Sequence, residues 1–167
     1  LELATPSHHL VFNSFNQLQR FKNLPRMTAL SHGRQLQLGL RINPEYSAGT
    51  VPMYDPCAPG SRLGVRKQQF QAAQLDQISG LHWHNLCEQN ADCLERTITA
   101  VEASFGDILP QMDYVNFGGG HHITRADYEL DLLVNLVKRF QDKWNTLVYL
   151  EPGEAVALNC GYFVTTV

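Results

Sequence analysis

The sequence contains no cluster of lysine and arginine residues and no long run of apolar residues. The 13 basic and 16 acidic residues give a net charge of -3, which gives no sign of the basic patch of a nucleic-acid-binding surface. No apolar run approaches the ~18 residues that span a bilayer, and the first residues lack the charged and apolar regions of a secretion signal. We therefore expect a cytoplasmic protein with neither a nucleic-acid partner nor a membrane partner.

Cysteine is scarce, and no two cysteines have the C-x-x-C spacing of a redox or metal motif. The chain has 167 residues, 44% of them hydrophobic, so it can bury a core without disulfide bonds. We expect reduced thiols, and we interpret Cys87 as a small buried residue rather than a nucleophile. The cysteines are Cys57, Cys87, Cys93 and Cys160.

Short apolar runs alternate with segments of helical spacing along the chain. The runs predict strands at residues 8–12, 37–42, 80–84, 114–117 and 147–150, with a further strand at 161–167. The helical spacing predicts helices at residues 15–21, 67–78, 92–105 and 124–144. Asn13–Ser14 is expected to cap the first helix, and Thr124–Asp127 resembles a capping box at the start of the last one.

This alternation predicts an α/β fold in which parallel strands are joined by right-handed crossovers. Strand centres lie roughly 30–40 residues apart, which is usual for a βα unit. Two architectures fit: a doubly wound sheet, or part of a (β/α)8 TIM barrel. A whole barrel takes about 250 residues, so roughly five βα units make a partial one. The long connection at residues 43–64 contains several turn signals and is expected to be functional or mobile.

Polar residues gather where the predicted strands end. The carboxyl ends of parallel strands meet at one edge, and ligands bind at that edge in both architectures, so we expect the functional site there. These residues are Arg41, Asn43, His82, His84, Gly118, Gly119, Gly120, His121, His122 and Glu151.

Three consecutive glycines, Gly118–Gly120, lie between a predicted strand and a predicted helix. Glycine lets a backbone approach an anion closely, and a helix N-terminus adds free N–H groups. The run therefore predicts either a phosphate site or a tight turn without a ligand. His121 and His122, which follow, could bind phosphate or face solvent. Neither the G-x-G-x-x-G fingerprint nor a Walker loop is present.

The other polar residues at the strand ends leave several chemistries open. His82 and His84 lie two apart on one strand, so they face the same way and could bind metal, stack on a ring or form a hydrogen-bonded pair. Glu151 could pair with a cationic ring nitrogen, bind metal, act as a base or form an ion pair with Arg41. Glu154 is expected near the N-terminus of a helix, where the helix dipole favours an acid.

Longer segments make a more specific pattern, which spans nearly the whole chain. They are VFNS at residues 11–14, LRINPEY at 40–46, YDPCAPGSRLG at 54–64, LHWHNLCEQN at 81–90, VNFGGGHHIT at 115–124 and EPGEA at 151–155. This pattern resembles the carboxynorspermidine decarboxylases, pyridoxal-phosphate (PLP) enzymes of fold type III built on the barrel of alanine racemase and eukaryotic ornithine decarboxylase. The resemblance implies a lyase that decarboxylates carboxynorspermidine, and carboxyspermidine, in polyamine biosynthesis.

Within this resemblance, each matching position implies a role. His84 matches the histidine that stacks on the cofactor ring, and Glu151 matches the acid that pairs with the pyridinium nitrogen, so both are expected to be catalytic. Gly118–Gly120 match the phosphate-binding loop, and Gly153 resembles a further phosphate neighbour. Arg41 matches an arginine near the cofactor.

Two positions are expected to bind substrate. Arg62 resembles an arginine that approaches the ring oxygen in alanine racemases. Glu154 stands where related decarboxylases often carry arginine after E-P-G. Together with Asp55 and Glu88, it is an acidic candidate for reading the amine tail of a small polyamine carboxylate. The resemblance further implies a homodimer for the full-length protein, and no metal.

A lysine at the end of an early strand is missing, although this chemistry needs one to form a Schiff base. The lysines are Lys22, Lys67, Lys138 and Lys143, all in predicted helices or loops. The resemblance places the reactive lysine N-terminal to Leu1. We therefore expect residues 1–160 to be an incomplete PLP-binding barrel domain and residues 161–167 to start a C-terminal β-domain, with this segment inactive on its own.

Two other functions are open from the residues alone. A metal-dependent barrel hydrolase could use His82, His84, Glu151 and either His121 or His122 as ligands, since paired histidines with a carboxylate suit zinc. That function leaves the three glycines without a role. A non-catalytic protein that binds the same cofactor on the same fold would also fit the pattern.

Overall fold

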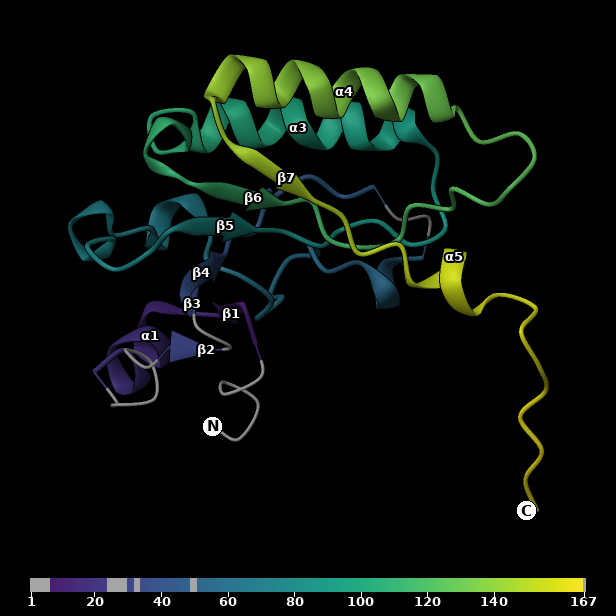
Figure 1. The fold of residues 1–167 in the computed structure, drawn as a ribbon, viewed down its shortest axis with the longest axis horizontal. Helices are drawn as coiled ribbons and strands as arrows, with labels where there is room; N and C mark the ends of the chain where they lie inside the picture. Colours follow the sequence, from purple (N-terminus) through teal and green to yellow (C-terminus); the bar gives the residue numbers. More distant parts are fainter. Residues whose placement is uncertain (1–6, 24–29, 32–33, 49–50, 167) are drawn as a thin grey trace.

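The computed structural model describes residues 7–23, 30–31, 34–48 and 51–166 of the chain (Figure 1). The strands are β1 (His9–Phe12), β2 (Leu30–Ser31), β3 (Arg34–Gln35), β4 (Gln37–Arg41), β5 (Gly80–His82), β6 (Tyr114–Asn116) and β7 (Leu147–Tyr149). The α-helices are α1 (Phe15–Phe21), α3 (Ala91–Phe105), α4 (Leu130–Trp144) and α5 (Gly153–Ala157). Single 3-10 turns are η2 (Pro52–Tyr54), η3 (Lys67–Gln69), η4 (Ala72–Gln74) and η5 (Leu109–Gln111).

Five strands form one parallel sheet in the order β1-β4-β5-β6-β7. Each strand after β1 is added at the same edge, so the order follows the chain without reversing. A doubly wound sheet reverses its strand order at a switch point, and this order therefore excludes that architecture. The sheet is an arc of a barrel, as one of the two predicted architectures required. β2 and β3 form a separate antiparallel pair.

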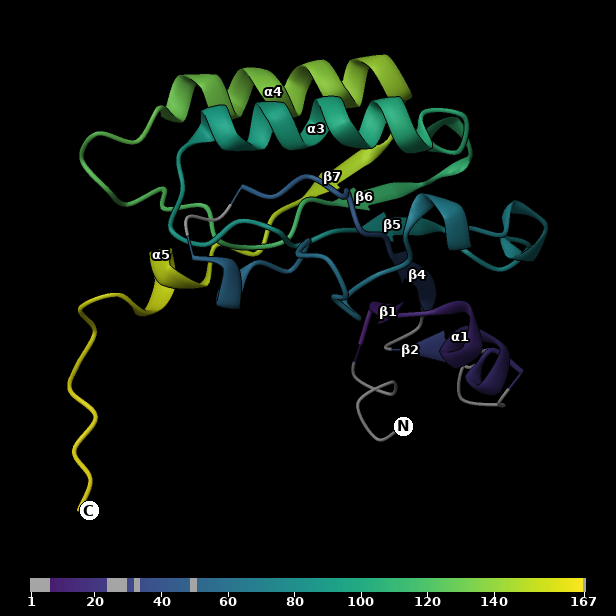
Figure 2. The same ribbon diagram turned by 180° about the vertical axis from the view of Figure 1, so that it is seen from behind.

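One face of the arc packs against a helical layer. Helices α3 and α4 lie side by side above β6 and β7 (Figures 1 and 2). Trp83 stacks on Phe117 with 4.7 Å between ring centroids, and Phe117 meets Phe140 of α4 at 5.0 Å. Each fully buried side chain of this size contributes roughly 1.5–3 kcal/mol. The helices form because apolar residues recur on one stripe, which in α3 consists of Ala91, Leu94, Ile98, Val101 and Phe105.

The other face of the sheet carries aromatic side chains near the amino-terminal ends of the strands. These rings pack against glycines of neighbouring strands. Tyr114 occupies the space that a side chain at Gly39 or Gly80 would need, because an added Cβ would lie under 3.0 Å from Tyr114 at either position. His9 and Tyr149 pack around the same ring, with centroids 4.3 and 5.8 Å away. Burial raises the pKa of the Tyr114 hydroxyl well above its ordinary value. The Tyr114 ring is therefore closely packed and buried at this end of the sheet.

One predicted helix is wrong. Residues 67–78 form the separate turns η3 and η4 instead of a single helix. Phe70 lies between these turns, and its ring packs edge-on against Phe15 and Phe105, with centroids 5.6 and 5.2 Å away. Contacts with two distant elements therefore place this segment, although its apolar spacing resembles that of a helix.

The last predicted helix starts later than expected. Helix α4 begins at Leu130 without a side-chain cap, so the predicted capping box at Thr124 does not form. Arg125 donates to Asp127 at 2.6 Å and also to the side chain of Asn90, which ties the preceding segment to the start of α3. The glycine run is consequently followed by turns, and the expectation of a helix N-terminus directly after it is wrong.

The end of the chain also differs from the prediction. Residues 161–166 form no strand, and Tyr162 and Phe163 are 99% and 93% exposed. Val167 lies outside the described residues. Both views show this segment extending away from the sheet beyond α5 (Figures 1 and 2).

Two expectations from composition have an outcome in the structure. All four cysteines are free, as predicted, but Cys87 is exposed rather than buried. Within the described ranges, no helix combines the length and the apolar character that a membrane crossing needs.

Candidate functional site

The rim at the carboxyl ends of the strands collects the polar side chains that alternation places on the inner face. Arg41, His82 and Asn116 are direct neighbours across β4, β5 and β6, and Asn116 is paired with Tyr149 of β7. Glu151 follows two residues after Tyr149, on the same face. The rim predicted from the sequence is therefore present, and Asn116 is an additional member that the sequence did not identify.

The glycine run closes tightly against its neighbours. Gly118 and Gly120 have φ values of 72° and 81°, in the left-handed region that favours glycine. A Cβ on Gly118 would lie under 3.0 Å from the carbonyl oxygen of Trp83. A Cβ on Gly119 would lie under 3.0 Å from the carbonyl oxygen of Glu151. A Cβ on Gly120 would meet another backbone oxygen under 3.0 Å away. Local packing therefore requires all three glycines, with or without a phosphate.

Two of the three amide N–H groups in this turn are already engaged. Gly118 donates to the Oδ1 of Asn116 at 2.8 Å, and Gly119 donates to the Nδ1 of His84 at 3.0 Å. The N–H of Gly120 makes no hydrogen bond within the described part of the chain. An anion that approaches this turn would meet that free donor.

His84 is held as a neutral imidazole with a defined tautomer. Because its Nδ1 accepts a hydrogen bond from Gly119, its proton lies on Nε2. Burial, and then the positive charge of Arg41, lowers the pKa of His84 below its ordinary value. Arg41 also donates to the backbone carbonyl of His84 at 3.1 Å. A neutral imidazole here can stack on a flat cationic ring without charge repulsion.

Glu151 is held through one of its two carboxylate oxygens. Its Oε1 accepts from the Nδ2 of Asn116 at 2.8 Å and lies 3.5 Å from the Nε2 of His82. The hydrogen bond from His82 is the main reason why the pKa of Glu151 lies below its ordinary value, so the carboxylate is charged at neutral pH. Within the described residues, Oε2 makes no hydrogen bond. The ion pair with Arg41 that the sequence left open does not form among those residues.

His121 is a buried part of the site. It is 1% exposed, and within the described chain neither ring nitrogen makes a well-formed hydrogen bond. Burial lowers the pKa of His121 to about 4, so the ring is neutral. The expectation that this histidine faces solvent is therefore wrong, while His122 is partly buried. Two polar residues after a glycine turn gave no sign of this burial in the sequence.

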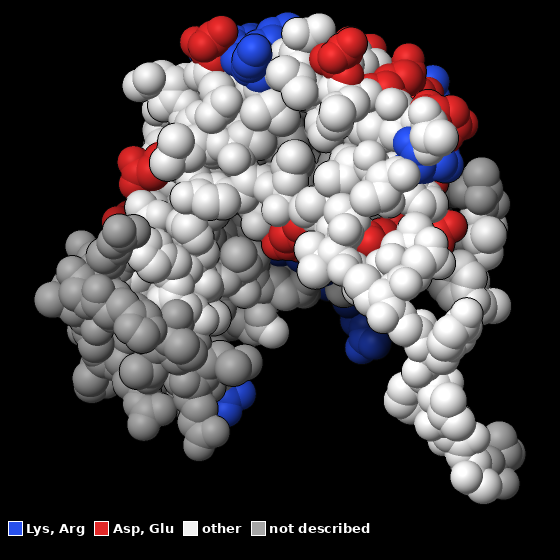
Figure 3. All heavy atoms as spheres, turned by 45° about the vertical axis from the view of Figure 1, so that its right-hand side comes forward, with Lys and Arg blue, Asp and Glu red and all other residues white. Residues whose placement is uncertain are grey.

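A hollow of about 420 Å³ opens beside this rim, and Glu151 lines it, whereas Arg41, His82 and Asn116 do not. Its wall includes His84, Gly119, Gly120, Glu151, Gly153 and Glu154. Figure 3 shows a concave surface beneath the helical layer, with acidic side chains along it and the C-terminal segment at one side. A larger hollow of about 690 Å³ lies at the amino-terminal ends of the strands, between residues such as Gln37 and Leu147. Barrels bind ligands at the carboxyl rim, so the smaller hollow is the candidate site.

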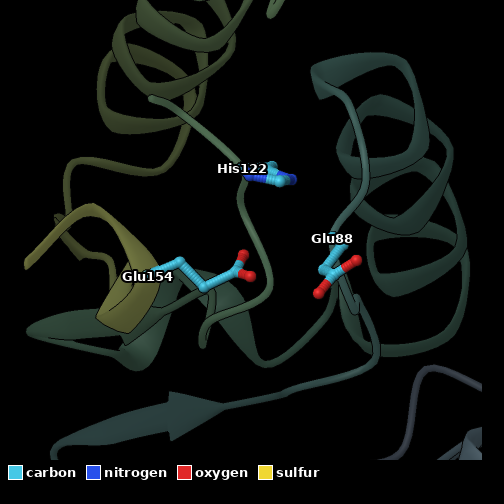
Figure 4. Close-up of side chains that lie close together, drawn as sticks. All are labelled: Glu88, His122 and Glu154. Carbon is cyan, nitrogen blue, oxygen red and sulfur yellow. The ribbon is translucent and has the colours of Figure 1, made fainter. Parts of the chain in front are cut away.

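A second polar cluster lies beside this hollow. Ligand atoms of Glu88, His122 and Glu154 all lie within 4.8 Å of one another, and Figure 4 shows the three side chains approaching from three separate segments. Glu154 lies in the first turn of α5, as predicted. The Oε2 of Glu154 and the Nδ1 of His122 are buried and make no hydrogen bond in the part of the chain that the structure describes. The cluster therefore offers several acceptors to a small cation.

The ligand set expected of a metal-dependent hydrolase does not come together. Among the described residues, His82, His84 and Glu151 are not a group whose ligand atoms all lie close to one another. The Nδ1 of His84 is occupied by a backbone N–H. The geometry therefore gives the hydrolase interpretation no support.

Several predicted residues are not brought to the centre of this site. Arg62 is exposed and lines a separate hollow beside the start of α1. Asp55 accepts from a nearby backbone N–H at 2.8 Å, which makes it part of a turn. Gly153 lines the hollow, but its N–H donates to the carbonyl of Glu151 at 2.8 Å. None of the four lysines, all of which are described, lines the hollow.

Comparisons with known proteins agree with the sequence pattern. No family model matches the chain. It is 45% identical over 166 residues to the carboxynorspermidine/carboxyspermidine decarboxylase of Campylobacter jejuni. The aligned region covers 99% of this chain and 41% of that protein. It is 38% identical over 160 residues to the carboxyaminopropylagmatine decarboxylase of a Synechocystis species, which covers 95% of this chain and 40% of that protein. The chain thus spans about two fifths of the curated relatives that it matches.

Solved structures show the same fold. The carboxynorspermidine decarboxylase of C. jejuni, complexed with norspermidine, superposes with a TM-score of 0.77 at 44% identity, over 93% of this chain and 37% of that one. A diaminopimelate decarboxylase from Helicobacter pylori superposes with a TM-score of 0.56 at 16% identity, over 84% of this chain and 38% of that one, a likeness of fold alone. The resemblance drawn from the motifs is therefore confirmed: over nearly its whole length, this chain is similar in sequence and in fold to the carboxynorspermidine decarboxylase of C. jejuni, and its five strands form part of a barrel.

Proposed function

We propose that this protein is a PLP-dependent decarboxylase of carboxynorspermidine and carboxyspermidine, a step of polyamine biosynthesis. One observation supports the proposal above the others. Gly119 and Gly120 of the glycine turn line one hollow together with Glu151, and the N–H of Glu151 donates to the carbonyl of Gly118 at 2.8 Å. A turn suited to phosphate and an acid suited to a ring nitrogen are therefore close enough to hold the two ends of one phosphorylated pyridine.

The rim residues fit this cofactor in three respects. Among the described residues, Glu151 offers an oxygen without a hydrogen-bond partner, His84 offers a neutral flat ring, and Gly120 offers an N–H without an acceptor. One residue fits poorly. The carboxylate of Glu154 lies on the same wall as the glycine turn, and like charge disfavours a phosphate beside it. Glu154 therefore needs a role other than phosphate binding.

PLP, when bound, supplies an electron sink for the electron pair that remains at Cα when CO2 leaves. The contribution of this chain is to keep a proton on the ring nitrogen. The Glu151 carboxylate is charged because its pKa is lowered, and direct attraction to that charge favours the protonated ring. His84 would cover one face of the bound ring and exclude water from it, while Arg41 holds the backbone of His84 through its carbonyl.

The expected substrate class is a polyamine that carries one carboxylate. The C. jejuni and Synechocystis relatives are named for different polyamine carboxylates, but all of these molecules end in a positively charged group. We assign recognition of that group to Glu88 and Glu154, which form an acceptor cluster with His122. An ammonium group donates three hydrogen bonds, and the cluster supplies three acceptors. This role gives Glu154 a reason to be acidic where related decarboxylases carry arginine.

Two substitutions at Glu154 test that assignment. Glu154→Gln removes the charge and should raise KM for carboxynorspermidine about 10-fold, the usual scale of a hydrogen bond to a charged group. The Kd of the cofactor should stay within about 2-fold. Glu154→Arg should remove amine recognition but tighten cofactor binding. Glu129→Gln, on the exposed surface before α4, is the matched control. An unchanged KM with weakened cofactor binding in Glu154→Gln would assign Glu154 to the phosphate end.

The proposed activity is tested on the full-length protein that contains this chain. Purified with PLP, it should show the visible absorbance of a bound cofactor and release CO2 from carboxynorspermidine, without sensitivity to chelators. A colourless protein whose activity requires a metal ion would overturn the proposal. Cofactor binding without CO2 release would instead identify a non-catalytic PLP-binding protein.

The 167-residue chain alone is expected to be inactive, because none of its four lysines lines the hollow. Turnover of carboxynorspermidine by the purified segment would contradict this expectation. We further propose that residues 1–160 belong to the PLP-binding barrel domain and that residues 161–167 begin a β-domain. The exposed rings of Tyr162 and Phe163 support this boundary, since they need a covering surface. A cytoplasmic homodimer is the proposed assembly, and analytical ultracentrifugation of the full-length protein tests it.

A further inference from the structure

We propose that Asn116 is a positioning residue, whose single amide holds the Glu151 carboxylate and the glycine turn in one fixed arrangement. The inference rests on the proposed function for its catalytic consequence, because the group that Glu151 serves is the ring nitrogen of the cofactor. Asn116 itself has no direct role in the chemistry and acts through its two partners.

The side chain of Asn116 uses both ends of its amide. Its Nδ2–H donates to the Oε1 of Glu151 at 2.8 Å, and its Oδ1 accepts from the N–H of Gly118 at 2.8 Å. The chemistry of the partners fixes the orientation of the amide. A carboxylate oxygen only accepts and a backbone N–H only donates, so a flipped amide would lose both bonds.

Strand pairing puts this amide between the two groups that it joins. Asn116 ends β6 on the inner face, next to His82 of β5 and Tyr149 of β7. The glycine turn begins two residues after β6 ends, and Glu151 follows the neighbouring strand β7. A shift of the turn is therefore transmitted to the carboxylate through one rigid planar group, without a flexible chain in between.

The amide also decides which oxygen of Glu151 is free. Both Asn116 and His82 converge on Oε1, at 2.8 and 3.5 Å, and Oε2 has no hydrogen bond within the described residues. With Oε1 held in this way, Oε2 is presented as the acceptor for a protonated ring nitrogen. Without the Asn116 donor, the half-exposed carboxylate can rotate and exchange its oxygens, so the ring nitrogen loses a fixed partner.

An asparagine that only capped the glycine turn would need the hydrogen bond to Gly118 but not the one to Glu151. Capping the N–H of Gly118 needs an oxygen, and aspartate supplies that oxygen as well as asparagine does. Donating to Glu151 needs an N–H, which aspartate lacks. Asn116→Asp therefore keeps the turn and breaks the link to the carboxylate, whereas Asn116→Ala breaks both.

The matched control is Asn43, at the end of β4. It is buried, its Nδ2 donates to two backbone carbonyls, and its Oδ1 accepts from the N–H of Glu45 at 2.9 Å. Among the described residues, it makes no hydrogen bond with Glu151. Asn43→Asp is therefore the same chemical change at a turn-capping asparagine that follows another strand of the same sheet, without the proposed link.

The first test follows the titration of the Glu151 carboxyl group in the full-length apoprotein by carbon-detected NMR. Asn116→Asp should raise the pKa of Glu151, because a donor is lost and a like charge is added, and Asn116→Ala should raise it less. The other charged or titratable groups around the carboxylate are Arg41, His82, His84 and His121, and none of them is changed. Asn43→Asp should leave the titration as in the wild type. An unshifted Glu151 in Asn116→Asp would overturn the inference.

The second test uses the holoenzyme. Asn116→Asp should lower kcat about 10-fold, the scale of one hydrogen bond to a charged group, with KM nearly unchanged. Glu151→Gln combined with Asn116→Asp should cost little more than Glu151→Gln alone, because Asn116 acts only by holding the charge that Glu151→Gln already removes. Additive losses would overturn the inference. A wild-type protein that binds no cofactor would defeat the proposed function instead, and the apoprotein titration would still decide the role of Asn116.

Discussion

The two ends of the same sheet differ in what holds their side chains in place. At the amino-terminal end, Tyr114 packs onto Gly39 and Gly80, so shape fixes the contacts. At the carboxyl end of the same strand, Asn116 joins Glu151 and Gly118 through hydrogen bonds of 2.8 Å. The two residues lie two apart on β6 and face the same way, yet one is part of a steric interior and the other of a polar network.

This difference predicts which substitutions should affect stability and which should affect activity. A packed interior responds to volume, and a change there costs stability in proportion to the atoms that must move. A polar rim that is partly open to solvent contributes less to stability, but its charges decide what binds. Changes at the two ends of one strand should therefore separate activity from stability.

The largest effect is expected for Glu151→Gln at the rim. Loss of the charge should lower kcat of the full-length enzyme about 10²–10³-fold, the scale seen when a preorganised electrostatic group is removed. Stability should change little, because the Glu151 side chain is 48% exposed. Steady-state kinetics and thermal unfolding of the same preparation check both outcomes. A loss of activity that only parallels a loss of folded protein would remove the distinction between the two ends.

Glycine substitutions at the two ends are expected to differ in kind. Gly80→Ala should destabilise the protein by about 1–3 kcal/mol through overpacking against Tyr114, with kcat per folded molecule unchanged. Gly118→Ala places a Cβ against a backbone oxygen at a φ of 72°, and should in addition weaken cofactor binding about 10-fold or more, because the turn must shift. Denaturant unfolding and cofactor titration measure the two effects. Equal losses of cofactor affinity in both variants would contradict the comparison.

A third prediction concerns pH, and it applies to the buried part of the rim. Burial lowers the pKa of His121 from 6.5 to about 4, so in this range the unfolded state binds a proton that the folded state refuses. The free energy of unfolding therefore keeps the whole contribution of His121 above pH 6.5, the pKa of the unfolded state. It falls as the pH drops below that value, by about 1 kcal/mol between roughly pH 6.5 and 5.5. His121→Gln removes this titration and should give a flatter profile of unfolding free energy. The same slope in both proteins would mean that His121 is not the responsible group.

The rim was predictable from the sequence because strand alternation and strand order are local and regular. Alternate residues of a strand face the same side of the sheet, and the carboxyl ends of parallel strands lie at one edge. The order of the strands is therefore enough to bring Arg41, His82 and Glu151 together at that edge. The glycine run was also recognisable. Its packing against neighbouring backbone oxygens was not, because that depends on segments far away in the sequence.

The misses have one physical cause: contacts between distant segments outweigh local patterns. Phe70 is anchored between two aromatic rings from other elements, so residues 67–78 form turns despite their helical spacing. Asn116 looked like an ordinary strand residue, although its parity and its place just before the glycines were a usable signal. The burial of His121 had no local signal, since its strand-like bridge to Gln89 joins residues that are far apart in the chain.

The smallest effect is expected at Arg62, and it sharpens the boundary of the rim. The Arg62 side chain is exposed beside a different hollow. Its backbone carbonyl, not its guanidinium, accepts a hydrogen bond from the side chain of Asn13 at 2.8 Å. Arg62→Ala keeps that bond, so cofactor Kd and substrate KM should stay within about 2-fold and stability within about 0.5 kcal/mol. Arg41→Ala is the contrast, because it releases the carbonyl of His84 and should weaken cofactor binding about 10-fold. If isothermal titration gives Arg62→Ala the larger loss, the connection at residues 43–64 must close over the rim in the loaded protein, and the site extends beyond the strand ends.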